Sequence, residues 1–143
     1  MKTNLKIDQT WWALRLTYGL VAFLAGLDKY FDLRANWESY LAPAIANLLP
    51  VSATSMMRTV GIVEMLVGVL ILTNWTRTGA YVASAWLLLI AFTLLLTGSY
   101  FDVAVRDVAM AVGAWTLARL TEVRHPAEAT VAGPVRRSAG AEA

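Results

Sequence analysis

The sequence contains no cysteine and a single histidine, His125, which lies beyond the last apolar segment. The absence of cysteine excludes disulfides, thiol catalysis and cysteine-ligated metal clusters within the chain. One histidine outside the apolar segments cannot build a bis-histidine haem or a histidine-rich metal site in the membrane. No glycine-rich phosphate loop or nucleophile–base pair is present either. We therefore expect no metal site and no intrinsic cofactor.

Charge is also scarce in this sequence. Charged residues make up 15% of the chain, against about 25% in ordinary soluble proteins, and hydrophobic residues make up 58%. Residues 78–101 carry no charge, and this run is longer than the ~20 residues that span a bilayer as a helix. The net charge is only +2, with basic residues near segment ends. We expect a lipid bilayer as the environment and no nucleic acid as a partner.

Four apolar segments predict an all-α fold, an integral membrane four-helix bundle formed by residues 1–121. Residues 30–57 carry an apolar stripe at helical spacing, which Pro43 interrupts and Pro50 ends. This pattern predicts a short interfacial helical segment between helices 1 and 2. Residues 122–143 combine prolines, small residues and charges, and predict a disordered tail. The four spans are expected at about residues 11–28, 57–73, 79–97 and 103–120.

The distribution of basic residues between the loops predicts how the bundle is oriented. With four spans, seven basic residues lie on the side of the two termini and four lie on the other side. We therefore expect the N-terminus, the C-terminus and the tail to be cytoplasmic. The seven are Lys2, Lys6, Arg77, Arg119, Arg124, Arg136 and Arg137.

One acid, Glu64, is the only charge between residues 60 and 76. A charge at the centre of a transmembrane helix costs at least ~2.5–3.5 kcal/mol, so Glu64 must be neutral, paired or near an interface. Glycines three residues before it and four residues after it share its helical face and let a neighbouring helix come close. The glycines expected to support helix packing are Gly19, Gly26, Gly61, Gly68 and Gly113.

The four-span topology gathers ionisable residues in the outer half of the bundle. Two of them, Lys29 and Arg106, are candidate partners for Glu64. The cluster has three interpretations: a clasp that packs the helices, a pocket that binds a quinone or another amphipathic ligand, or part of a proton or ion path. A path needs a polar group nearer the inner side, and Arg15 is the candidate, unless it extends to the near interface. The residues predicted to bind a ligand or to hold the helices together are Lys29, Glu64, Arg106, Asp107 and Asp28 in this outer cluster, and Arg15 nearer the inner side.

The stretches RLTYGLVAFLAGLDK and GIVEMLVGVLIL, the short basic turn TRTGA and a fourth helix that opens with Arg106 form a recognisable set. Across residues 11–121 the chain resembles the DoxX family of small four-helix membrane proteins. The resemblance implies a multi-pass protein of the prokaryotic inner membrane, associated with redox chemistry, like the subunits of thiosulfate:quinone oxidoreductase. Many relatives carry a histidine in the third helix, where this chain has Trp86 and other uncharged residues.

These observations lead to one functional hypothesis and two alternatives. The first is an accessory or quinone-binding subunit of a membrane oxidoreductase system, acting with other subunits or a soluble redox protein. If the chain takes part in catalysis, we expect it to be part of a quinone-linked oxidoreductase rather than a self-sufficient enzyme. The alternatives are a non-enzymatic scaffold that anchors a partner protein, and a small carrier or lipid-handling protein. The sequence leaves the oligomeric state open, a homo-oligomer included.

Overall fold

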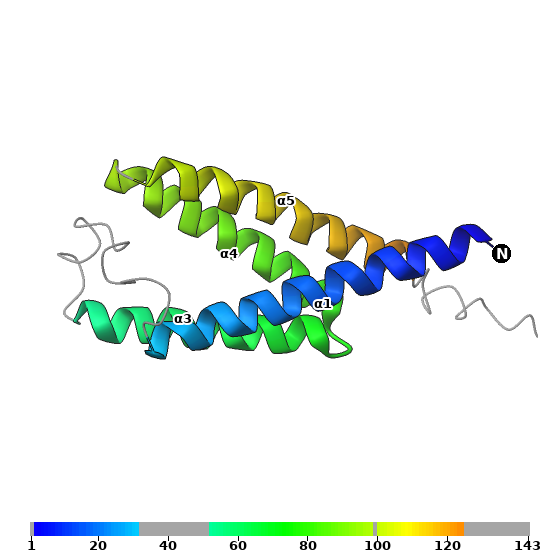
Figure 1. The fold of residues 1–143 in the computed structure, drawn as a ribbon, viewed down its shortest axis with the longest axis horizontal. Coiled ribbons are helices and arrows are strands. Elements are labelled where there is room, and N and C mark those ends of the chain that lie inside the picture. Colours follow the sequence, from blue (N-terminus) through cyan, green and yellow to red (C-terminus); the bar gives the residue numbers. More distant parts are fainter. Residues whose placement is uncertain (1, 32–51, 99, 125–143) are drawn as a thin grey trace, which may run out of the picture.

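The computed structural model describes residues 2–31, 52–98 and 100–124 of the chain (Figure 1). This part of the chain forms four helices and no strands, which confirms the predicted all-α class. The segment predicted at the membrane surface falls largely outside the described residues, and so does the tail beyond Arg124. The helices are α1 (Lys2–Phe31), α3 (Ala53–Leu72), α4 (Thr76–Thr97) and α5 (Phe101–Arg124).

Three of these helices are long and apolar enough to cross a membrane: α1 over Leu5–Phe31, α3 and α4. The helix α5 has 24 residues and similar length, but ionisable residues fall near both of its ends. The helices therefore indicate a membrane protein, and the crossing by α5 stays a prediction. The ionisable residues of α5 are Asp102, Arg106, Asp107, Arg119, Glu122 and Arg124.

Two helices extend well beyond the predicted spans. The helix α1 begins at Lys2, and α5 continues to Arg124, so residues 122–124 are helical and do not belong to the tail. The two extensions pack on each other: Arg124 Nε donates to Asp8 Oδ1 over 2.7 Å, and its guanidinium lies 4.0 Å from the ring centre of Trp11. Contacts between residues more than a hundred positions apart thus stabilise these helix ends. Local sequence patterns did not predict that the helices extend so far.

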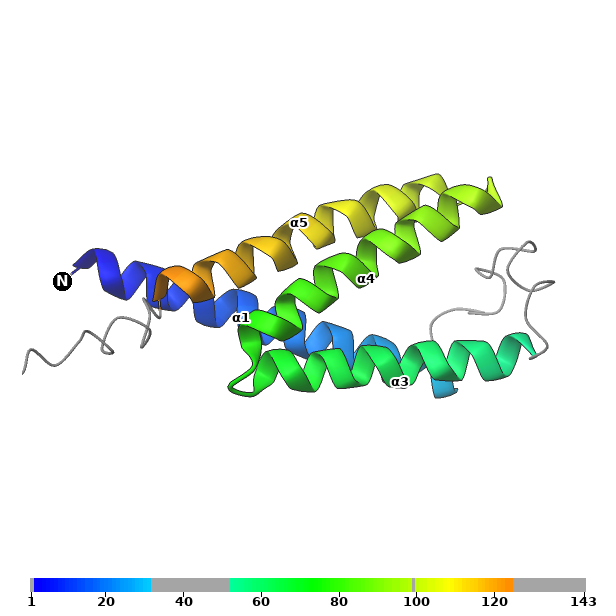
Figure 2. The ribbon, with the colours of Figure 1, turned by 180° about the vertical axis from the view of Figure 1, so that it is seen from behind.

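Two helix pairs make up the bundle. The helix α1 runs along α3, and α4 runs along α5 (Figure 1). The pairs meet where α3 turns into α4 and separate progressively toward the opposite end, as Figure 2 shows from behind. The separating end holds the C-terminus of α1 and the N-terminus of α3 on one side, and the α4–α5 connection on the other. Any space between the pairs is therefore expected toward this end.

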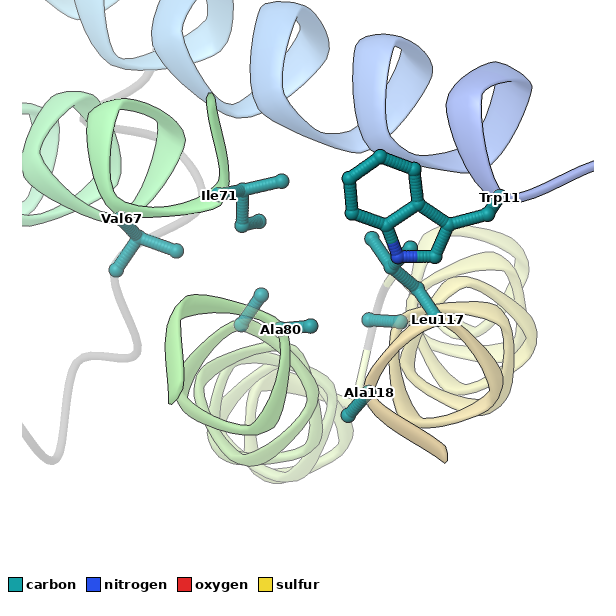
Figure 3. Packing of buried hydrophobic residues seen from close by; sticks show 8 residues of the cluster. Trp11, Val67, Ile71, Ala80, Leu117 and Ala118 are labelled. Carbon is teal, nitrogen blue, oxygen red and sulfur yellow. The ribbon is translucent and has the colours of Figure 1, made fainter. Parts of the chain in front are cut away.

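The main hydrophobic core explains why the pairs meet where they do. It joins all four helices around the fully buried side chains of Ile71 and Leu117, with Trp11 reaching across from α1 (Figure 3). Trp11 Nε1 donates to Thr121 Oγ1 over 2.7 Å, so the indole is fixed at both its apolar and its polar edge. A second cluster of Ala91, Leu94 and Ala104 joins only α4 to α5.

Candidate functional site

Glycine pairs bring the backbones of α1 and α3 into direct contact. A Cβ atom on Gly61 would lie 2.6 Å from the carbonyl oxygen of Gly26, and one on Gly68 would lie 2.7 Å from that of Gly19. Any larger residue would force the helices apart, because real Cβ atoms do not approach backbone so closely. This close approach sets the register in which α1 and α3 meet, and it carries the neighbouring polar residues together.

The register places Lys29 of α1 against Glu64 of α3. Lys29 Nζ lies 2.6 Å from Glu64 Oε2, and the exposed fractions of the two side chains are 6% and 11%. Lys29 is thus the partner that Glu64 finds, of the two that the sequence offered. The ammonium group of Lys29 gives the Glu64 carboxylate a counter-charge within the apolar helices. Pairing lowers the free-energy cost that either charge would have if it were buried alone.

The remaining residues of the predicted outer cluster lie at different depths. Asp28 is buried next to Lys29. Asp107 of α5 is half-buried and interacts electrostatically with both Lys29 and Glu64. Arg106 is exposed, and its charge acts on Asp107. The structure therefore gathers Lys29, Glu64 and Asp107 across the two helix pairs and leaves Arg106 at the surface.

Arg15 lies apart from this cluster. It is fourteen residues before Lys29, which corresponds to about 21 Å along a helix. Its guanidinium donates to three carbonyl oxygens at the end of α3: Nε to Ile71 over 3.0 Å, and Nη2 to Leu72 over 2.6 Å and to Thr73 over 2.8 Å. These carbonyls have no partner within the helix, and a cation suits that end of the helix dipole. Arg15 caps α3.

The fifth predicted packing glycine, Gly113, serves the contact between α1 and α5. A Cβ atom there would collide with the hydroxyl group of Tyr18. The missing side chain leaves room for the phenol of Tyr18 to reach α5. Tyr18 thereby closes one wall of the space between the helix pairs.

That space is a small cavity at the centre of the bundle, with walls from all four helices. Its volume is about 80 Å³. The walls are mainly aliphatic, and the polar groups come from Glu64, Tyr18 and Trp86. The apolar lining consists of Val21, Ala22, Ala25, Val67, Ala83, Leu87 and Met110. Apolar walls with a few convergent polar groups are typical of small-molecule sites.

Trp86 and Tyr18 line the cavity, and the sequence analysis placed neither of them in the predicted cluster. The indole of Trp86 lies close enough to the Glu64 carboxylate to interact with it, yet its Nε1 is buried without a hydrogen-bond partner among the described residues. Helical spacing offered a signal, since Ala83, Trp86 and Leu87 step by three and four along α4. This spacing could not show which neighbouring helix the face of α4 with Trp86 packs against.

Chemically, the arrangement offers the indole N–H of Trp86, the hydroxyl group of Tyr18, the carboxylate of Glu64 and apolar walls for a hydrocarbon body. No group of three or more histidine or acidic side chains in the described ranges is placed to hold a metal ion. Comparisons of the chain with protein-family models, with curated proteins and with solved structures gave no match.

Proposed function

We propose that this chain is an accessory, quinone-binding subunit of an oxidoreductase system in the prokaryotic inner membrane. The observation that carries the proposal is the cavity between the two helix pairs, where Glu64 and Trp86 face mainly apolar walls. A ring with polar oxygens and an apolar tail matches this combination. The expected similarity to DoxX-family proteins points to the same class of ligand.

The size of the cavity limits how such a ligand fits. Its volume of about 80 Å³ is smaller than the roughly 150 Å³ of a cavity that encloses a benzene ring. A quinone would therefore insert one oxygen-bearing edge and leave the rest of its ring between the pairs, or push the pairs apart. The helix pairs separate beyond the core that joins all four helices, and that core borders the cavity at Val67 and Ala83.

An accessory role agrees with the composition of the chain. The sequence contains no cysteine, so thiol-based or cysteine-ligated electron carriers would have to come from another subunit or from a soluble redox protein. We place both termini in the cytoplasm on the basis of the loop charges. In that orientation the cavity lies in the outer half of the bilayer.

A second candidate function is a non-enzymatic scaffold for a partner protein. Two observations favour it: the closed Lys29–Glu64 pair and an exposed apolar face on α4. That face includes Leu88, Leu89, Phe92, Leu95 and Leu96. The carrier hypothesis is less well supported, because Arg15, the inner polar group that a path would use, is engaged by the end of α3.

Mass spectrometry of lipids that copurify with the protein tests the proposal. Ala83 is buried and lines the cavity, so Ala83→Leu fills it, whereas Ala85 on the same helix is exposed. We expect a quinone to copurify with the wild type and with Ala85→Leu, and to be lost from Ala83→Leu. Quinone in none of the three, or equally in all three, would overturn the assignment of this cavity. Retention of a stoichiometric protein partner without quinone would support the scaffold.

A further inference from the structure

At the end of the bundle where the helix pairs meet (Figure 2), one carboxylate holds two arginines. Glu122 of α5 accepts at Oε1 from the hydroxyl group of Tyr81 over 3.0 Å, and Arg77 Nη2 lies 2.9 Å from the same oxygen. Arg119 Nη1 donates to Oε2 over 2.7 Å. The side chain of Glu122 is 22% exposed, whereas those of Arg77 and Arg119 are 64% and 58% exposed. Glu122 thus positions an arginine pair, Arg77 of α4 and Arg119 of α5, at the surface.

The arginine pair keeps the capacity to bind an anion. Two cations share one carboxylate, so the group that they form with Glu122 carries a net positive charge. A guanidinium has five N–H donors, and the contacts with Glu122 engage one nitrogen of each arginine. Donors that Glu122 leaves unused can bind phosphate, whose oxygens match the planar fork of a guanidinium. Three donors already surround Glu122, so the group has little to offer an ammonium ion.

The charge of this whole half of the bundle favours the same class of ligand. Among the described residues from Lys6 onward, five basic and two acidic residues lie in this half, against three basic and four acidic residues in the separating half. An anionic surface is therefore attracted to this half and not to the other. The charged residues of this half are Lys6, Asp8, Arg15, Arg77, Arg119, Glu122 and Arg124.

Exposed tryptophans indicate that this end lies at the boundary between the bilayer and water. Trp12, Trp75 and Trp115 are 46%, 65% and 51% exposed, and all three lie in this half of the bundle. Tryptophan side chains of membrane proteins gather at the level of the lipid headgroups. The guanidinium of Arg119 lies 5.9 Å from the ring centre of Trp115, so the arginine pair has the depth of a lipid phosphate.

An apolar strip continues from the arginine pair toward the middle of the two helices. On α5 it follows from Arg119 by steps of four and three residues, and on α4 it follows from Tyr81 by the same steps. The hydrogen bond that Tyr81 makes to α5 places both faces on one side of the helix pair. The strip consists of Trp115 and Val112 on α5 and of Ala85 and Leu88 on α4, all exposed.

We propose that Arg77 and Arg119 bind the phosphate group of one anionic phospholipid, whose acyl chains lie along this apolar strip. The arginine pair supplies the positive charge, and the strip supplies contacts at the depth of the chains. A free phosphate ion would use the arginines alone. A zwitterionic lipid brings an ammonium group that the arginine pair repels, so the preferred headgroup has a phosphate and no cation, as in phosphatidylglycerol. This lipid site is separate from the cavity at Glu64 and does not depend on a quinone.

Native mass spectrometry of the full-length, delipidated protein in detergent tests the proposal. The probes are phosphatidylglycerol and phosphatidylcholine with identical palmitoyl and oleoyl chains. The wild type should bind one phosphatidylglycerol at least about fivefold tighter than phosphatidylcholine, the effect of one net positive charge near an anionic headgroup. Arg77→Gln with Arg119→Gln should reduce this preference to less than about twofold. The matched control is Lys6→Gln with Arg58→Gln, which removes the same charge from two exposed sites elsewhere and should keep the preference.

Three results would overturn the lipid site. The first is equal binding of the two lipids by the wild type. The second is a control variant that loses the preference as fully as the arginine variant, which would assign it to net charge alone. The third is displacement of phosphatidylglycerol by sodium phosphate but not by sodium chloride of equal ionic strength, which would assign the arginine pair to a free phosphate ion. If the double arginine variant does not fold, Arg77→Gln and Arg119→Gln made singly decide, and each should lower the preference by at least about twofold.

Discussion

Replacing Lys29 by methionine removes the cation that neutralises Glu64 and keeps an unbranched side chain in its place. The exposed fractions of 6% and 11% show that neither side chain has much contact with solvent. Removing one partner of a buried pair typically costs 3–5 kcal/mol, because an uncompensated charge remains. Without Lys29, Glu64 can lose its charge by binding a proton. For an ordinary glutamate this protonation costs about 4 kcal/mol of free energy at pH 7. Both routes predict that Lys29→Met lowers the free energy of unfolding by about 3–5 kcal/mol.

The double variant Lys29→Met with Glu64→Leu separates the effect of charge from that of packing. Apolar residues of similar volume often replace a buried ion pair at no cost, so we expect the double variant to recover most of the loss. Equilibrium unfolding in mixed micelles, followed by far-ultraviolet circular dichroism, measures all three free energies. Arg58→Met is the control, because Arg58 is an exposed cation on α3 and should change the free energy by no more than about 0.5 kcal/mol.

Two results would refute this reasoning. Wild-type stability of Lys29→Met would mean that solvent reaches Glu64 and that the pair contributes little to folding. A double variant as unstable as the single one would mean that the loss comes from the packing of the lysine stem and not from the charge of Glu64. Measured at pH 5, the loss in Lys29→Met should be smaller than at pH 7, because the compensating proton is then easier to supply.

Three further predictions concern packing and topology. Gly68→Ala should lower the free energy of unfolding by about 1–3 kcal/mol, because its Cβ atom would lie 2.7 Å from the carbonyl oxygen of Gly19; unchanged stability would contradict the close contact. Trp11→Phe removes the 2.7 Å hydrogen bond to Thr121 and should cost about 1–2 kcal/mol in the same assay, an effect that Thr121→Val should not add to. A topology reporter fused after Ala143 should give a cytoplasmic signal. A periplasmic signal would contradict the predicted arrangement of four spans with both termini in the cytoplasm.

Much of the fold follows from local sequence patterns. The apolar runs determine four helices, since only a helix satisfies its own backbone hydrogen bonds in an apolar surrounding. The glycine spacing around Glu64 and the matching glycines of the first helix identify the faces on which α1 and α3 meet. The pairing of Glu64 with Lys29 was foreseeable as one of two options, because an acid in an apolar helix requires a partner at its own depth.

The predictions that sequence could not make depend on contacts between distant segments. Arg15 carries the same kind of charge as Lys29, and only the turn after α3 reveals that it caps carbonyl groups. Arg106 has the right depth to meet Glu64, but the rotation of α5 directs it to the surface. Rotation about a helix axis is set by packing against neighbours and not by depth in the sequence.

The cavity is the clearest case of a feature that tertiary structure alone decides. Composition and periodicity predicted a membrane bundle with one acid, Glu64, inside an apolar helix, because those properties act within one helix or between adjacent ones. The cavity needs two helix pairs that join through a core at one end, around Ile71 and Leu117, and separate toward the other. The angle between the pairs arises from many side chains in four helices at once. That angle places Trp86 of α4 beside Glu64 of α3, which no single segment encodes.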